Sequence, residues 1–246
     1  FAGHAYGRVP TASDYNALTV EDVHAFQQKY FTPANTAIAI SGDFASGEIK
    51  PAFEQSFQEW AAAAKPQRTV AAALDTATQR TVYTYDVDKL QAWLVLGHEL
   101  PVVPLEDQAP LQVMNYILGG GHFDTRLFRE SRDKRGLTND ASGFIEPNWR
   151  GPGSYTFRTY GRPKVAHLLV ELTLAEIDRI RTEPVSAEEL FVAKNALATG
   201  EFEMWFENGH TTAQTFAKEW LRYGNHRATA SYRQRVRAVT PEKVLA

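Results

Sequence analysis

The stretch GGGHFDTRLFRESRDKRGLTND places a run of glycines directly ahead of a segment dense in arginine. The glycines are Gly119, Gly120 and Gly121. A glycine-rich loop beside cationic side chains can cradle a phosphate or hold a carboxylate. The stretch has neither G-x-G-x-x-G nor the ending G-K-[ST], and no parallel strand–helix–strand pattern surrounds it. The sequence therefore argues against a phosphate site, and we expect Gly119 to end the preceding helix in the left-handed conformation.

Arginine recurs at every third position behind the glycines, as Arg126, Arg129, Arg132 and Arg135. This spacing predicts a basic stripe along one side of a helix. Two interpretations stay open. Either the arginines pair with Glu130, Asp133 and other acids, or they attract an acidic or carboxylate-ended peptide.

Metal ligands are scarce in this sequence. It has no cysteine, and none of its seven histidines begins H-x-x-E-H or H-E-x-x-H. His98 is followed by Glu99, but no histidine follows at the required spacing. His167 and Glu171 would share one helix face, yet two ligands are too few for a zinc site. We expect no metal to be bound by this chain.

Composition limits the class of protein. The 246 residues are 43% hydrophobic with a net charge of −3, so neither a nucleic-acid surface nor a disordered acidic tail is predicted. No apolar run is long enough to span a membrane, and the first ten residues do not form a signal peptide. No methionine starts the chain and its last residues begin a helix, so both ends look cut. The sequence leaves the compartment unknown, because a protein without cysteine is stable in cytosol or periplasm alike; a soluble protein of bacterial periplasm or cytoplasm is the expectation.

Periodicity predicts an α+β fold in which a mostly antiparallel sheet is covered by helices. Thr19 and Asp22 have the spacing of a capping box at the start of a helix. Residues 61–78 are rich in alanine and contain proline, which is typical of a linker. Strands are expected at 36–40, 80–86, 91–98, 138–146 and 154–160. Helices are expected at 49–60, 105–118, 123–135, 164–181, 186–208, 210–223 and 228–237.

Two short segments of the sequence are similar to each other, as an internal duplication would produce. The segment ALTVEDV at residues 17–23 is similar to AVTPEKV at residues 238–244. A pattern this short also arises by chance, because it is a common helix start. A true duplication would have a unit of about 220 residues, far longer than the unit of a solenoid repeat.

Several segments, taken in order, resemble the insulinase/pitrilysin family of zinc peptidases, the inverzincins, which include mitochondrial processing peptidase. The matching segments are HAYGR (4–8), LTVEDV (18–23), YFTPAN (30–35), IAISGD (38–43), LGGG (118–121) and RLFRESRDKRGL (126–137). The resemblance implies two similar α+β halves that enclose a peptide substrate. Residues 1–72 would then be the tail of the first half, and residues 73–246 the second, substrate-binding half.

The resemblance also shows what this chain lacks. The family's zinc motif H-x-x-E-H belongs to the first half and is absent here. Zinc would therefore be bound in the parent protein and not by this chain, which we expect to be inactive alone. The parent would hydrolyse extended peptides. The alternative is a noncatalytic structural or partner subunit with the same fold. Both readings imply a homo- or hetero-oligomer with another such half.

Site residues follow only from the resemblance. The family carries an arginine and a tyrosine seven residues apart that contact substrate, and the matching positions here are Arg132 and Asn139. An asparagine amide can donate like the tyrosine hydroxyl but is shorter, so this departure favours the noncatalytic alternative. The resemblance also implies that Gly119, Gly120 and Gly121 form a loop that touches substrate.

Aromatic residues concentrate between residues 143 and 160. They are Phe144, Trp149, Tyr155, Phe157 and Tyr160. Because neighbouring strand residues point to opposite faces, alternate members either line the floor of the substrate chamber or pack within the sheet.

Overall fold

The computed structural model describes residues 8–60, 80–148 and 151–245. The chain divides into two compact units. Unit 1 comprises Phe1–Leu74 and Met204–His226, and unit 2 comprises Asp75–Glu203 and Arg227–Ala246. The linker expected at 61–78, and the boundary expected between residues 72 and 73, lie outside the described residues.

Unit 1 is helical in its described part. Its helices are α1 (Ala12–Asn16), α2 (Val20–Tyr30), η2 (Pro33–Asn35), α3 (Ser46–Ser56) and α9 (Gly209–Tyr223). The capping box at the start of α2 is confirmed: the backbone N–H of Thr19 donates to Asp22 at 3.0 Å, and the backbone N–H of Asp22 donates to the Thr19 hydroxyl at 3.2 Å. The hydrogen bonds that the Asp22 carboxylate accepts from the backbone N–H and the hydroxyl of Thr19 lower its pKa.

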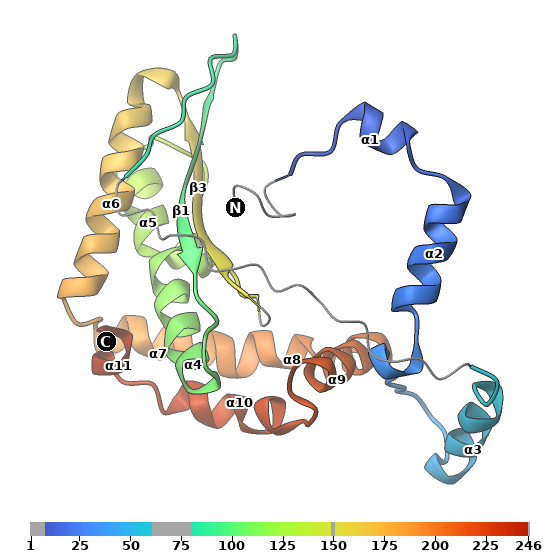
Figure 1. Ribbon diagram of the computed structural model, residues 1–246. Helices are drawn as coiled ribbons and strands as arrows, with labels where there is room; N and C mark the ends of the chain where they lie inside the picture. Colours follow the sequence, from blue (N-terminus) through green and yellow to red (C-terminus); the bar gives the residue numbers. More distant parts are fainter. Residues whose placement is uncertain (1–7, 61–79, 149–150, 246) are drawn as a thin grey trace. The chain divides into compact units, whose positions relative to one another are not determined.

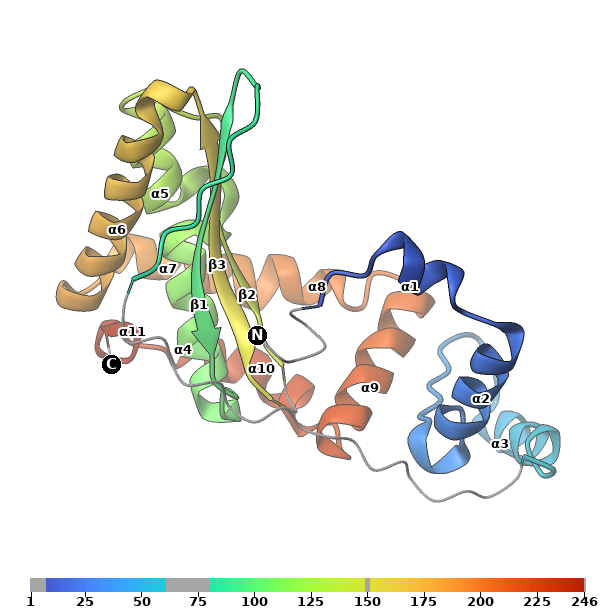
Figure 2. The same cartoon turned by 45° about the horizontal axis from the view of Figure 1, so that its top comes forward.

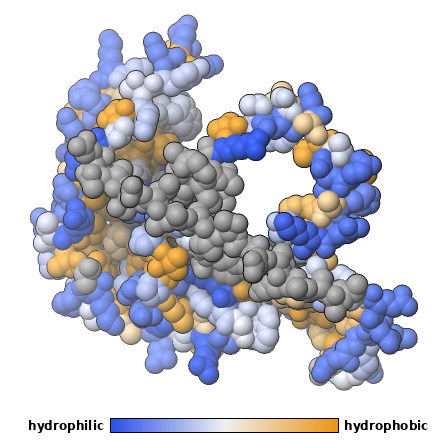
Figure 3. All heavy atoms as spheres, viewed as in Figure 1, coloured by the Kyte–Doolittle hydropathy of each residue, from blue (hydrophilic) through white to orange (hydrophobic). Residues whose placement is uncertain are grey.

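Apolar side chains of unit 1 are left open to solvent. On and around α2 they are Leu18, Val20, Val23, Phe26 and Phe31. Figure 3 shows apolar residues interleaved with hydrophilic ones along this stretch. The strand expected at 36–40 is wrong, since these residues have no strand partner among the described residues and Ile38 and Ile40 are exposed. A strand needs a neighbour for its backbone hydrogen bonds, which an apolar pattern alone does not supply.

Unit 2 is built on a three-stranded antiparallel sheet, which confirms the expected fold class. The strands are β1 (Ala92–Leu100), β2 (Ala141–Glu146) and β3 (Gly153–Gly161), in the spatial order β1-β3-β2. Figure 1 shows β1 beside β3, and β2 is labelled in Figure 2. Three expected strands are thereby confirmed. The strand expected at 80–86 is wrong, because this segment pairs with no strand among the described residues and its Tyr83 and Tyr85 are almost fully exposed.

The two faces of the sheet have different surroundings. Helices α4 (Leu105–Asn115), α5 (Arg126–Phe128) and α6 (Ala166–Thr182) lie on one side (Figure 2). Tyr155 and Phe157 of β3 are buried on this covered face. Residues at the alternate positions, such as Arg158 and Tyr160, point the other way. We call this second side the open face.

Three helices of unit 2 widen into π-helical turns. These turns are η3 (Tyr116–Gly120) after α4, η5 (Arg129–Asp133) after α5, and η7 (Ala196–Glu201) after α7 (Ala187–Asn195). The remaining elements are η4 (His122–Asp124), η6 (Pro163–Val165), α8 (Phe202–Met204), α10 (Arg227–Arg237) and α11 (Pro241–Leu245). Leu118, Leu169 and Val236 are fully buried in the core. No helix among the described residues is both long and apolar enough to cross a membrane.

Candidate functional site

Arg132 lies in a helical segment with well-defined ends. The Thr125 hydroxyl caps its start by accepting a hydrogen bond from the backbone N–H of Phe128 at 3.2 Å. Gly136 ends it with a left-handed φ of 60°, and its N–H donates to the carbonyl of Arg132 at 2.7 Å. Only glycine adopts this conformation without strain. The two caps therefore fix the turn from which Arg132 projects.

The guanidinium group of Arg132 rests on aromatic rings. Its Cζ lies 4.8 Å from the ring centroid of Phe128 and 5.9 Å from that of Phe123. Nη1 is 3.4 Å from the carboxylate of the neighbouring Asp133. The side chain is still 45% exposed. A guanidinium stacked on rings keeps its in-plane donors for a carbonyl or carboxylate.

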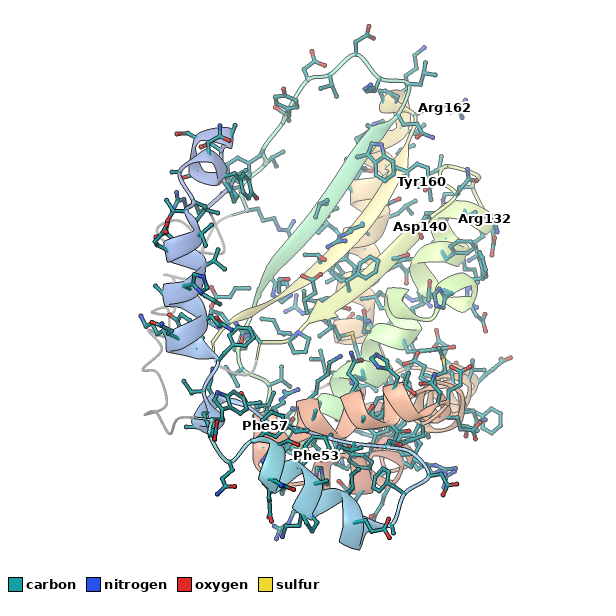
Figure 4. All side chains as sticks on the ribbon, turned by 90° about the vertical axis from the view of Figure 1, so that its right-hand side faces the viewer. Phe53, Phe57, Arg132, Asp140, Tyr160 and Arg162 are labelled. Carbon is teal, nitrogen blue, oxygen red and sulfur yellow. The ribbon has the colours of Figure 1, made fainter. Side chains whose placement is uncertain are left out.

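Asn139 is exposed in a bend just before β2. The chain beside it is held by hydroxyl groups: Thr138 and Thr159 donate to the carbonyl of Asp140 at 2.7 and 2.8 Å. The Ser142 hydroxyl donates to Oδ1 of Asp140 at 2.6 Å. Figure 4 shows Asp140 and Arg132 at the same end of the sheet. The substrate contacts expected of Arg132 and Asn139 stay predictions.

The three glycines continue the helix that was expected to end before them. Gly119 and Gly120 belong to η3, and Gly121 follows it. The expected left-handed cap at Gly119 is wrong, because the described glycines with positive φ are Gly136 and Gly224. Gly119 permits close packing instead: a Cβ there would lie 2.7 Å from the backbone nitrogen of Gly143. The expected contact of the three glycines with substrate stays a prediction.

Arg126 anchors the arginine segment to α7. Its Nε and Nη2 donate to the two carboxylate oxygens of Glu189 at 2.7 and 2.9 Å. Arg126 is 3% exposed and the side chain of Glu189 is 18% exposed. The hydrogen bonds from Arg126, with one from the backbone of Ser186, lower the pKa of Glu189 to about 2. Glu189 also completes the capping box of α7 with Ser186.

The arginines do not form one continuous stripe. Arg126 points inward to Glu189, Arg132 lies beside Asp133, and Arg135 donates to Glu130 at 2.7 Å. Arg129 lies 3.7 Å from Glu189. The interpretation that these arginines pair with acids is therefore confirmed. The π-helical turn η5 changes the angular spacing, so a period of three residues does not keep one face.

The described residues do not fit a zinc site. They contain no group of three or more histidine, aspartate or glutamate side chains placed to hold a metal ion. His167 and Glu171 are both exposed on α6.

The aromatic cluster separates into two sets. Tyr155 and Phe157 pack on the covered face, and burial raises the pKa of the Tyr155 phenol. Its hydroxyl donates to Oδ1 of Asn115 at 3.0 Å. Phe144 and Tyr160 lie on the open face. Trp149 lies outside the described residues.

Three features of the site were not predicted from the sequence. Trp93 on β1 lies opposite Tyr160, Arg158 stacks on Phe144, and Glu189 anchors Arg126. Alternation within 91–98 could have placed Trp93 on a definite face. The Ser186–Glu189 spacing of a capping box could have marked Glu189, but its distant partner has no local signal.

The family of the peptidase M16 inactive domain matches residues 17–197. The chain belongs to this family. The resemblance to insulinase/pitrilysin zinc peptidases is thereby confirmed. The matched range includes the predicted site residues of the M16 domain and the anchor between Arg126 and Glu189.

Curated relatives of this M16 domain carry the name zinc protease. An uncharacterized zinc protease of Streptomyces coelicolor is 25% identical over 254 residues, which cover 100% of this chain and 54% of the relative. One of Mycobacterium leprae is 22% identical and is covered to 55% of its length. The chain thus spans about half the length of the curated relatives it matches.

Solved structures agree on the fold. A peptidase M16 inactive domain of Pseudomonas fluorescens has a TM-score of 0.78 at 21% identity, covering 95% of this chain and 54% of that one. A protease of Helicobacter pylori has a TM-score of 0.77 at 20% identity, covering 96% and 56%. A chain of complex III2 of Candida albicans has a TM-score of 0.77 at 15% identity, covering 96% and 56%.

Proposed function

We propose that this chain is the noncatalytic, substrate-binding half of an M16 zinc peptidase that hydrolyses extended peptides. The family match and the zinc-protease names of the relatives support this proposal. In it, zinc belongs to the parent protein and is held outside this chain.

The placement of Arg132 carries the proposal. Its guanidinium is stacked on two rings, half exposed, and held by capped helical turns at one end of the sheet (Figure 4). Such a group can donate two parallel hydrogen bonds to a carboxylate, or a single one to a peptide carbonyl. In the proposal the Asn139 amide donates beside it, and Gly119, Gly120 and Gly121 let the backbone come close to the peptide.

The peptide is proposed to bind in an extended form. The sheet of unit 2 has β1 and β2 at its edges in the described part of the chain. A peptide that adds to an edge gains backbone hydrogen bonds that do not depend on its sequence. Affinity for many unfolded peptides follows from this mode of binding.

The proposal includes a duplicated architecture. Residues 1–72 would be the tail of a first similar half, and residues 73–246 the second half. The exposed apolar side chains of α2 support this, because Val23 and Phe26 would be buried once a first half packs on them. A homo- or hetero-oligomer could supply that half instead.

One observation favours a second candidate function. A chain of complex III2 of Candida albicans has a similar fold, so this fold is also found within a multi-subunit complex. Asparagine at position 139, where the family pattern has tyrosine, fits a chain that takes no part in catalysis. The alternative is a structural or partner subunit without peptidase activity.

The test is peptide cleavage by the parent protein, with and without chelator, and with Arg132→Ala. We expect chelator-sensitive cleavage and a fall in kcat/KM of about tenfold to a hundredfold for Arg132→Ala. Arg181→Ala removes an exposed arginine of the same unit and should leave kcat/KM within about twofold. Absence of zinc and of cleavage in the parent would favour the structural alternative.

A further inference from the structure

Two aromatic rings stack on the open face of the sheet. Trp93 of β1 lies directly opposite Tyr160 of β3, and their rings stack with centroids 4.7 Å apart and planes 29° apart. Trp93 is 74% exposed, although tryptophan offers the largest apolar surface of any side chain. A stacked pair whose tryptophan is this exposed is the type of surface on which ligands bind.

The rings continue into a larger surface. Arg158 precedes Tyr160 by two residues on β3, and its guanidinium lies 4.8 Å from the ring centroid of Phe144. Val95 of β1 lies directly opposite Arg158. Strand alternation places all five side chains on the open face. We call Trp93, Val95, Phe144, Arg158 and Tyr160 the aromatic shelf.

Charge beside the shelf is positive. Arg162 follows Tyr160 by two residues, is exposed, and lies at the same end of the sheet (Figure 4). Within the described ranges no carboxylate comes within ion-pair distance of Arg162. Of the acids nearby, Glu146 lies 3.5 Å from Arg158, and Asp140 accepts a hydrogen bond from the Ser142 hydroxyl at 2.6 Å.

We propose that the aromatic shelf is a side-chain subsite for an extended peptide that carries an aromatic residue followed closely by an acidic one. The aromatic ring stacks against Trp93 and Tyr160, and the acidic group pairs with Arg162. The choice of a peptide rests on the proposed function.

The composition of the shelf favours a peptide over a protein subunit. Permanent interfaces bury about 20 to 30 residues a side and have few charges at their centre. The shelf has five side chains, and Arg158 stands in the middle of it. A strand added along the edge of β1 would bring every second side chain over Trp93 and Val95.

The experiment compares three labelled peptides of one extended sequence by fluorescence anisotropy on this chain. One carries Phe and Asp at the two key positions, the second carries Ala and Asp, and the third Phe and Asn. We expect the first to bind about tenfold more tightly than the second and several-fold more tightly than the third at low salt. Equal binding of all three overturns the proposal.

Substitutions assign the effect to the shelf. Trp93→Ala should remove the preference for Phe, Trp93→Phe should keep much of it, and Arg162→Ala should remove only the preference for Asp. Phe191→Ala, which truncates another exposed aromatic side chain of unit 2, should change neither preference. Preferences that survive both Trp93→Ala and Arg162→Ala contradict the proposal, and thermal unfolding confirms that each variant is folded.

The parent protein separates this inference from the proposed function. If the parent cleaves peptides but Trp93→Ala does not change its preference for the Phe peptide over the Ala peptide, the proposal for the shelf is wrong. The peptidase proposal is then unaffected. Binding that depends on Trp93, in a parent that cleaves nothing, supports the shelf and removes the peptidase proposal.

Discussion

Single residues in this chain differ in how their neighbours support them. Arg132 is stacked on Phe128 and Phe123 and follows a capped helix start, so its position is defined before any peptide binds. Asn139 is an exposed residue of a bend with a short side chain. Arg132 is therefore the stronger candidate for orienting a substrate. Gly119 supports the site indirectly, because it lets η3 approach β2 closely.

Gly119→Ala should lower the free energy of unfolding by about 1 to 3 kcal/mol, because the added Cβ overlaps the backbone of Gly143 and the side chain of Leu127. Gly200→Ala is the matched control, since a Cβ there meets nothing within 4 Å. It should be neutral or stabilising by about 0.5 to 1 kcal/mol. Urea unfolding measures both. Equal effects would show that the close approach of Gly119 does not matter for packing.

Among the elements, the contact between α5 and α7 determines how the arginine segment is held. Arg126 and Glu189 are 63 residues apart in the sequence and form a bidentate ion pair away from solvent. The same carboxylate accepts a hydrogen bond from the backbone of Ser186 at 2.9 Å. One glutamate thus starts α7 and fixes the segment that carries Arg132.

Glu189→Gln should lower the free energy of unfolding at neutral pH by about 3 kcal/mol, because it leaves Arg126 buried without a counter-charge. The folded-state pKa of Glu189, about 2, lies below its ordinary value of 4.5. The stabilisation is therefore complete above about pH 5 and is lost as the pH falls toward 2. Unfolding measured at several pH values should show the two proteins converging in acid.

The control for this prediction is Glu183→Gln. Glu183 pairs with Arg179 at 3.2 Å, but its side chain is 63% exposed. Its removal should cost less than about 1 kcal/mol at every pH. A difference between wild type and Glu189→Gln that stays constant from neutral pH to pH 2 would contradict the role of the ion pair.

The whole chain corresponds to about half of its curated relatives, and its described part offers no zinc site. It belongs to the family of the peptidase M16 inactive domain, whose model matches residues 17–197. The exposed apolar residues of α2 remain the observation behind the proposal that a first half packs on this chain.

Zinc and chelator should leave the thermal unfolding of this chain unchanged, because a ligand stabilises a fold only when the folded state binds it. The parent protein should lose peptide cleavage on the same chelator treatment. The measurement is unfolding by circular dichroism with zinc added and with zinc removed. A midpoint that rises with zinc, in proportion to one bound ion per chain, would contradict the absence of a zinc site.

The sequence by itself determined the class of fold, the three strands of the sheet, the capping box of α2, and the family. These depend on local signals: alternation, helix periodicity, the Thr19–Asp22 spacing, and motifs that keep their order. The absence of the zinc motif is equally a property of the sequence.

Only the tertiary structure decided which of the sequence patterns form the elements and contacts that they predict. Segments 36–40 and 80–86 have the composition of strands, but no strand in the described part of the chain pairs with them. Arg126 leaves the expected stripe because Glu189, distant in sequence, lies within reach inside the fold. Trp93 meets Tyr160 through the register of β1 on β3. In each case the outcome depends on residues that are distant in the sequence. Their contacts contribute free energy only after folding has brought them together.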